Sequence, residues 1–118
     1  MHELLTASGQ QALHAAEALQ PAEEDFLRHF SALQRVYPAE LTRAALEIAI
    51  LRQEAQGKFP FANKLYFTRQ ALEQSSSYQV ASYRARRYEG FELILDLGCS
   101  VGCDTLALAE QAFTLGVD

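Results

Sequence analysis

The sequence predicts a mainly helical N-terminal module followed by the first β-α-β unit of a doubly wound α/β fold. Two observations support this fold class. Apolar residues recur at helical spacing through much of the first 90 residues, and a strand, a glycine turn, a helix and a second strand follow over residues 91–118. Because such a sheet normally has about six or seven strands, we expect this chain to be the N-terminal, truncated part of a larger enzyme.

Three helices are expected in residues 1–57. Thr6 or Ser8 provides an N-cap for the first helix, Pro21 begins the second, and Pro38 separates the second from the third. The second helix has a stripe of apolar residues at three- and four-residue steps, which predicts one buried face. These residues are Phe26, Leu27, Phe30, Leu33 and Val36.

Two shorter helices are expected in residues 58–90. Thr68 is the predicted N-cap of the first, and the serines at 75–77 end it and cap the next. The same segment contains the one locally basic patch of the chain, made of Lys64, Arg69, Arg84, Arg86 and Arg87. Arginines can contact RNA phosphates, although a solvated helix face explains the same pattern.

The glycine turn follows a short apolar strand at residues 93–95. Asp96 closes this strand at its carboxyl end, where open α/β sheets bind ligands. Gly98 and Gly102 lack side chains where the backbone approaches a ligand or takes a positive φ. Asp118 follows Gly98 by about 20 residues, the offset at which an acid after the second strand usually meets a ribose hydroxyl.

The run Asp96-Leu-Gly-Cys-Ser-Val-Gly102 resembles motif I, Asp-x-Gly-x-Gly-x-Gly, of class I S-adenosylmethionine-dependent methyltransferases. Leu115-Gly-Val-Asp118 looks like the end of their second strand. The upstream run of residues 58–77 is similar to the segment before motif I in the THUMP-like group, which is related to trimethylguanosine synthase. Ser100 and Cys103 depart from the glycines of that pattern, and a serine fits there while its φ stays negative.

The resemblance implies a mainly α N-terminal helical module followed by the first β-α-β unit of a truncated Rossmann-like α/β methyltransferase fold. It divides the chain into a helical bundle at 1–57, a helical segment at 58–90 and the start of the cofactor-binding domain at 91–118. The implied cofactor is S-adenosyl-L-methionine and the implied methyl acceptor is RNA. The implied cofactor-binding residues are Phe67, Thr68, Asp96, Gly98, Ser100, Gly102 and Asp118. Acceptor-orienting residues are expected beyond Asp118, so no catalytic residue is named.

Two alternatives stand beside the methyltransferase. The dinucleotide turn Gly-x-Gly-x-x-Gly, aligned on Gly98, requires glycines where Ser100 and Cys103 stand, so it matches less well. The other alternative is a helical protein-interaction module without catalytic activity, in which residues 1–90 are the working part.

Composition excludes several classes of function. A net charge of −5 gives no general nucleic-acid footprint, and no apolar run approaches the roughly 20 residues of a membrane span. The two cysteines have no histidine near them in sequence, so we expect no metal site. A cytoplasmic location is expected. A truncated sheet leaves an open edge and an uncovered apolar face, so we also expect the chain to self-associate.

Overall fold

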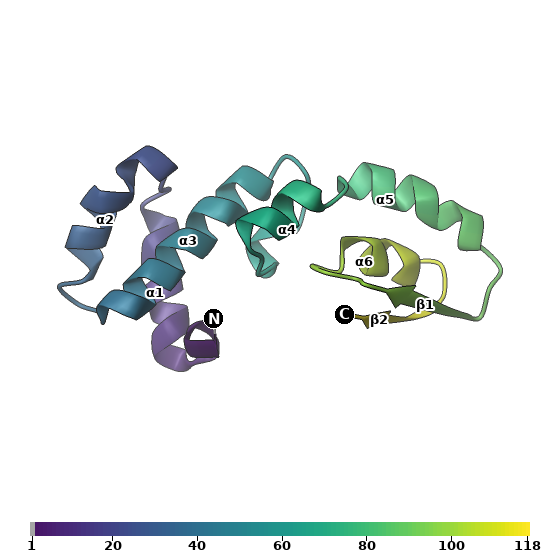
Figure 1. Ribbon diagram of the computed structural model, residues 1–118, viewed down its shortest axis with the longest axis horizontal. Coiled ribbons are helices and arrows are strands. Elements are labelled where there is room, and N and C mark those ends of the chain that lie inside the picture. Colours follow the sequence, from purple (N-terminus) through teal and green to yellow (C-terminus); the bar gives the residue numbers. More distant parts are fainter. Residues whose placement is uncertain (1) are drawn as a thin grey trace. The chain divides into compact units, whose positions relative to one another are not determined.

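The computed structural model describes residues 2–118 and divides into two compact units, Met1–Glu54 and Ala55–Asp118. The first unit contains three α-helices, α1 (Ala7–Ala18), α2 (Phe26–Leu33) and α3 (Ala39–Ala55), of which α3 ends at the unit boundary (Figure 1). Short 3-10 turns at His2–Leu5 and Glu23–Asp25 precede α1 and α2. The predicted division of the chain into three parts, with boundaries after residues 57 and 90, stays a prediction.

The N-terminus of α1 is fixed by its cap and by a close backbone contact. The Thr6 hydroxyl accepts a hydrogen bond from the Gly9 N–H at 3.0 Å, as the sequence predicts for an N-cap. A Cβ built on Gly9 would lie 2.0 Å from the Glu3 carbonyl oxygen and 2.5 Å from the Leu4 Cα. Only glycine therefore allows the 3-10 turn to fold back onto α1, and this packing buries Leu4 completely.

Helix α3 supplies most of the core of the first unit. Residues 48–52 are buried in succession, so the helix is enclosed on all sides there, and Ala45 and Leu46 are fully buried. Arg52, near the end of α3, is also buried and donates from Nη1 to Glu17 Oε1 of α1 at 2.5 Å. This ion pair joins α1 to α3, and the carboxylate compensates the cost of burying the guanidinium.

Helix α2 contributes much less to the core than its pattern predicts. None of its residues is buried. Leu27 is 78% exposed, and Val36, just after the helix, is 74% exposed. The predicted buried stripe is therefore wrong for these two residues, while Phe26 and Phe30 are half-buried and stack on each other.

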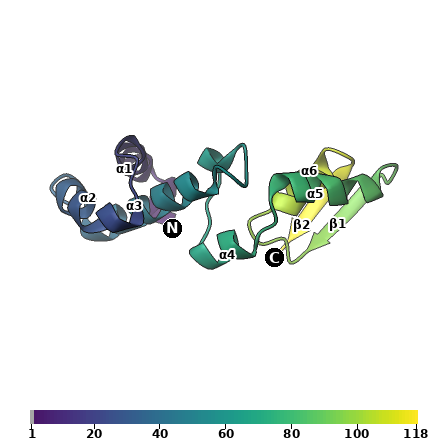
Figure 2. The same cartoon turned by 90° about the horizontal axis from the view of Figure 1, so that it is seen from above.

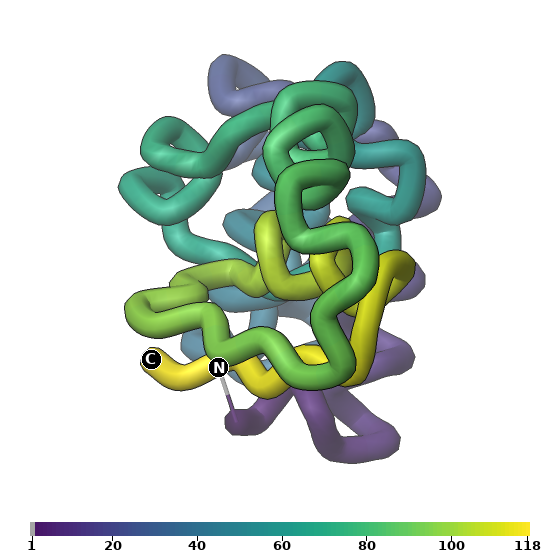
Figure 3. Tube along the Cα trace, turned by 90° about the vertical axis from the view of Figure 1, so that its right-hand side faces the viewer, coloured from purple at the N-terminus to yellow at the C-terminus, as the bar shows by residue number. Residues whose placement is uncertain are grey.

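The second unit contains two helices, a strand, a helix and a strand in that order. These are α4 (Arg69–Gln74), α5 (Tyr78–Ala85), β1 (Leu93–Leu97), α6 (Cys103–Ala109) and β2 (Phe113–Val117). The strands pair in parallel, from Leu93 opposite Phe113 to Leu97 opposite Val117. Helix α6 packs against the sheet and α5 packs against α6 (Figures 1 and 2). Figure 3 follows the chain from α5 through β1 to α6 and β2.

The predicted fold class is wrong. Residues 2–118 form six α-helices and only a two-stranded parallel sheet near the C-terminus, so the chain is mostly helical. This does not match a helical module followed by a Rossmann-like unit. The physical reason is that a doubly wound sheet has helices on both faces, whereas Leu95 and Leu115 on the second face of this sheet are exposed. Local strand and turn patterns specify single elements and do not specify how many strands assemble.

Candidate functional site

The glycine turn between β1 and α6 has three residues in the left-handed region. Their φ angles are 71° at Gly98, 51° at Ser100 and 81° at Gly102. The φ angle of Ser100 is positive, so the condition under which a serine fits the glycine pattern without strain is not met. A side chain in this region costs roughly 1–2 kcal/mol. Hydrogen bonds from the Gly98 and Cys99 N–H groups to the Val117 carbonyl, at 2.6 and 3.0 Å, hold the turn against the end of β2.

Asp118 contacts the strained serine directly. Its Oδ1 accepts a hydrogen bond from the Ser100 N–H at 3.2 Å, although 18 residues separate the two in sequence. The carboxylate therefore helps to hold the positive φ of Ser100 by satisfying its backbone donor. Two of the predicted site residues are thus brought together at the carboxyl end of the sheet.

Asp96 is directed toward α6. Its Oδ2 accepts a hydrogen bond from the Thr105 hydroxyl at 2.6 Å, and its side chain is half-buried. The register places Gly116 of β2 beside Asp96, and a Cβ on Gly116 would lie 2.9 Å from Thr105 Oγ1. The glycine therefore gives space for the threonine, and the Asp96–Thr105 bond attaches the first turn of α6 to β1.

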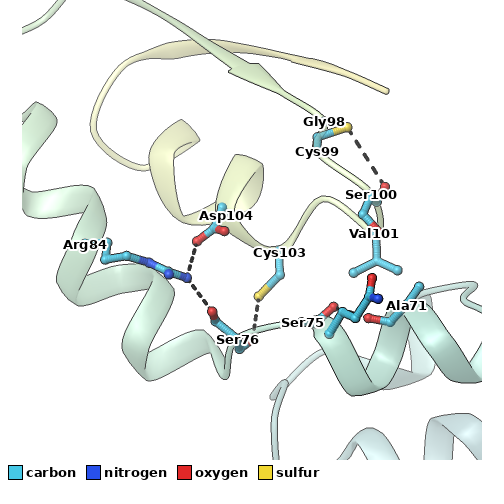
Figure 4. Close-up of a pocket in the computed structure, with 11 residues that line it drawn as sticks. Ala71, Ser75, Ser76, Arg84, Gly98, Cys99, Ser100, Val101, Cys103 and Asp104 are labelled. Carbon is cyan, nitrogen blue, oxygen red and sulfur yellow. Dashed lines mark hydrogen bonds and ion pairs between the residues drawn. The ribbon is translucent and has the colours of Figure 1, made fainter.

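A pocket of about 310 Å³ lies beside the turn (Figure 4). Of the predicted residues, Gly98 and Ser100 line it, while Asp96, Gly102 and Asp118 are in or next to the same turn without lining it. The other lining residues come from the turn itself and from the segment that contains α4 and α5. They are Ala71, Gln74, Ser75, Ser76, Arg84, Cys99, Val101, Cys103 and Asp104.

Arg84 is the cationic side chain of the pocket lining, and its charge is paired. Its Nη2 lies 2.9 Å from Asp104 Oδ1 and also donates to the Ser76 hydroxyl, and Figure 4 shows all three side chains converging. Both members of the ion pair are about half exposed. An RNA phosphate at Arg84 would have to compete with this carboxylate. The sequence indicated Arg84 only as part of a basic patch, because nothing in the spacing shows its contact with Asp104.

Cys103 at the start of α6 is a buried thiol. Its Sγ lies 3.5 Å from the Ser76 carbonyl oxygen, to which it donates. Burial raises the pKa of the thiol to about 11, and the neighbouring Asp104 carboxylate adds to the increase. Cys99, which lines the same pocket, is only half-buried. The two cysteines therefore differ in access, although they are four positions apart.

We expect iodoacetamide at pH 8.5 to label Cys99 and to leave Cys103 nearly unmodified in the folded protein. The thiolate is the reactive form, and a pKa of about 11 leaves well under a tenth of Cys103 ionised at that pH. Peptide mass spectrometry of the labelled protein measures both sites. In urea both cysteines should react alike, which is the control. Equal labelling in the folded protein would contradict the buried position of Cys103.

Phe67 and Thr68 lie away from the pocket lining. Phe67 is buried, and its ring lies 6.3 Å from that of Phe59, so it is part of an aromatic cluster. The Thr68 hydroxyl accepts from the Ala71 N–H at 3.1 Å, which confirms the predicted N-cap of α4. The geometry gives each a structural role, and contact of either with a cofactor stays a prediction.

The end of α4 depends on Lys58, which the sequence analysis did not single out. Its Nζ donates to the Leu72 carbonyl at 2.7 Å and to the Ser75 carbonyl at 3.1 Å. An ammonium at this position satisfies two carbonyls that the helix itself leaves without partners. No sequence pattern between Lys58 and the two carbonyls predicts this contact.

Two features are absent from the part of the chain that the structure describes. Residues 2–118 contain no group of three or more His, Cys, Asp and Glu side chains arranged to hold a metal ion. Within the same residues no helix has both the length and the apolar character needed to cross a bilayer.

Comparison with known proteins gives one match. The model of a family described as a domain of unknown function (DUF8688) matches residues 1–55, which include α1, α2 and α3. No curated protein and no solved structure matches the chain. The matched residues and the residues that line the pocket therefore belong to different parts of the chain.

Proposed function

We propose that this chain binds S-adenosyl-L-methionine at the glycine turn, as part of a methyltransferase that acts on RNA. The observation that supports the proposal best is the contact of Asp118 with the Ser100 N–H beside the pocket. A carboxylate accepts several hydrogen bonds at once, so Asp118 can hold the turn and also accept a hydrogen bond from a ribose hydroxyl. The pocket volume of about 310 Å³ is at the lower end of the range for small-molecule sites.

The chemistry of methyl transfer fits a site of this kind. The methyl group of a sulfonium is already activated, so the protein has to align the cofactor with its acceptor and accommodate the positive charge. Backbone groups of the turn provide polar surroundings at the pocket, and the Asp118 carboxylate lies near it, while Asp104 is paired with Arg84. Two free cysteines suit a reducing compartment, so we also propose a cytoplasmic location.

Asp118→Ala should weaken binding of S-adenosyl-L-methionine by about 1.5–3 kcal/mol, the usual range for hydrogen bonds to a charged group. The measurement is calorimetric titration of the protein as its gene encodes it. Asp118→Asn, which keeps an acceptor oxygen, should lose less. Glu89→Ala is the matched control, since this acid lies before β1 and does not line the pocket. If Asp118→Ala binds S-adenosyl-L-methionine as tightly as the wild type, Asp118 is not part of the site. If the wild type does not bind S-adenosyl-L-methionine, the proposed cofactor is wrong.

A second candidate function has one observation in its favour. Helix α2 exposes Leu27, and Val36 just beyond the helix is exposed as well, so the apolar stripe of this segment is only partly covered. These residues lie in the part matched by the family model. A helical protein-interaction module therefore remains the alternative, and it requires no binding of the cofactor.

A further inference from the structure

The sheet of the second unit has one face covered by α6 and one face of six apolar side chains. Side chains alternate along a strand, and the parallel register aligns every second residue of β1 with its neighbour in β2. The sheet face opposite α6 consists of Leu93, Leu95, Leu97, Phe113, Leu115 and Val117. These six side chains are between 47% and 76% exposed, whereas Ile94, which points toward α6, is buried.

The area of this sheet face is close to what a stable interface needs. A fully exposed leucine or valine side chain presents roughly 100–140 Å² and a phenylalanine side chain somewhat more, so the six together present about 400–500 Å² at their observed exposure. Monomeric proteins rarely expose contiguous apolar patches larger than a few hundred Å². A standard protein–protein interface buries about 800 Å² on each partner. The sheet face therefore supplies about half or more of the area that one partner buries in such an interface.

Charge does not oppose a second copy of this chain as the partner. None of the six residues of the sheet face is charged. Residues 55–118 contain six lysines and arginines against seven acids, a net charge of −1, whereas residues 1–54 have a net charge of −4. Two copies of the second unit would therefore approach with little electrostatic repulsion. An uncharged apolar face can also pack against the same face of a second copy, as a two-fold symmetric interface requires.

We propose that two copies of this chain form a dimer in which the sheet faces of their second units pack against each other. Sheets pack face to face about 10 Å apart, with the side chains of both faces interdigitated. None of the six residues lines the pocket beside the glycine turn. The dimer therefore leaves that pocket accessible, and it does not depend on the proposed cofactor.

Sedimentation velocity over a wide range of concentrations tests the dimer. The wild type should pass from monomer to dimer, and Leu95→Lys should weaken the dimer at least about 100-fold, because two ammonium groups would be buried in an apolar interface. Leu27→Lys makes the same change at an exposed leucine of α2 and should leave the dimer unchanged. A wild type that stays monomeric overturns the proposal. A dimer that Leu95→Lys leaves intact, or that both variants weaken equally, also overturns it.

A complementary pair of variants identifies the surface itself. Leu95→Lys and Leu95→Glu should each dimerise weakly when alone. When they are mixed they should form a heterodimer, because the opposite charges meet only if the sheet face of one copy packs on the sheet face of the other. Hydrogen exchange of wild-type β1 and β2 needs no variant and should slow as concentration rises. If the mixture stays monomeric and the exchange rates of the strands do not change with concentration, the sheet face is not the interface.

Discussion

Gly9→Ala should destabilise the first unit by about 2–3 kcal/mol, the range for overpacking a well-packed site. A methyl group at this position would lie 2.0 Å from the Glu3 carbonyl oxygen and 2.5 Å from the Leu4 Cα, and both are backbone atoms that cannot rotate away. The 3-10 turn at His2–Leu5 must therefore separate from α1. Leu4, which is fully buried, would then lose its packing against the helix.

The sign of this change in the free energy of unfolding distinguishes the backbone clash at Gly9 from the effect of helix propensity alone. In an ordinary helix interior, replacing glycine with alanine stabilises by roughly 1 kcal/mol. Gly57→Ala is the matched control, because a Cβ on Gly57 meets no atom within 4 Å and its φ is not positive. Hydrogen exchange of the α1 amides measures the change in the first unit separately from the second. A stabilised α1 in Gly9→Ala would show that the 3-10 turn does not pack as described.

Phe59→Ala should cost the second unit about 3–5 kcal/mol, the usual loss for a buried phenylalanine. Phe59 is 1% exposed and lies at the centre of an aromatic cluster, with the rings of Phe61 and Phe67 each 6.3 Å away. Phe61 in turn meets the edge of the Tyr78 ring at the start of α5. Removing the central ring leaves a cavity that these neighbours cannot fill without leaving their present contacts.

Phe91→Ala is the matched control for the aromatic cluster. Phe91 is also a phenylalanine of the second unit, but it is 60% exposed and its one ring contact is with Tyr88. Its removal should change the free energy of unfolding by less than about 1 kcal/mol. Hydrogen exchange of the α4 and α5 amides, measured at increasing denaturant concentration, compares the stability of the two variants. Equal losses in both would show that Phe59 is not the centre of a packed core.

The features that the sequence predicts correctly are local. Thr6 and Thr68 cap α1 and α4 through hydrogen bonds to the N–H three residues later, and Ser77 caps α5 in the same way. A cap needs only the right side chain next to the right backbone, so its residues can be recognised in the sequence. The short strand, the glycine turn and the helix that follows it form for the same reason, since their residues are contiguous.

The features that the sequence misses depend on distant partners. The fold class required a count of strands and of the helices that cover them, which no single segment specifies. The positive φ of Ser100 depends on Asp118, 18 residues away, and the pairing of Arg84 depends on Asp104, 20 residues away. The sequence therefore indicated where the turn lies, while the other residues of the pocket became visible only in the structure.

Lys58 has a consequence for the order in which the second unit folds. Its carbonyl accepts from the Tyr78 N–H at 2.8 Å while its ammonium caps α4, so residues 58–78 form a closed loop. The Lys58–Tyr78 contact and the pairing of Leu93 with Phe113 span equal lengths of chain, so the time of loop closure, roughly 10–100 ns for about ten residues, does not by itself set their order. Because residues 58–78 are synthesised before β1 and β2, this loop can close before the sheet pairs.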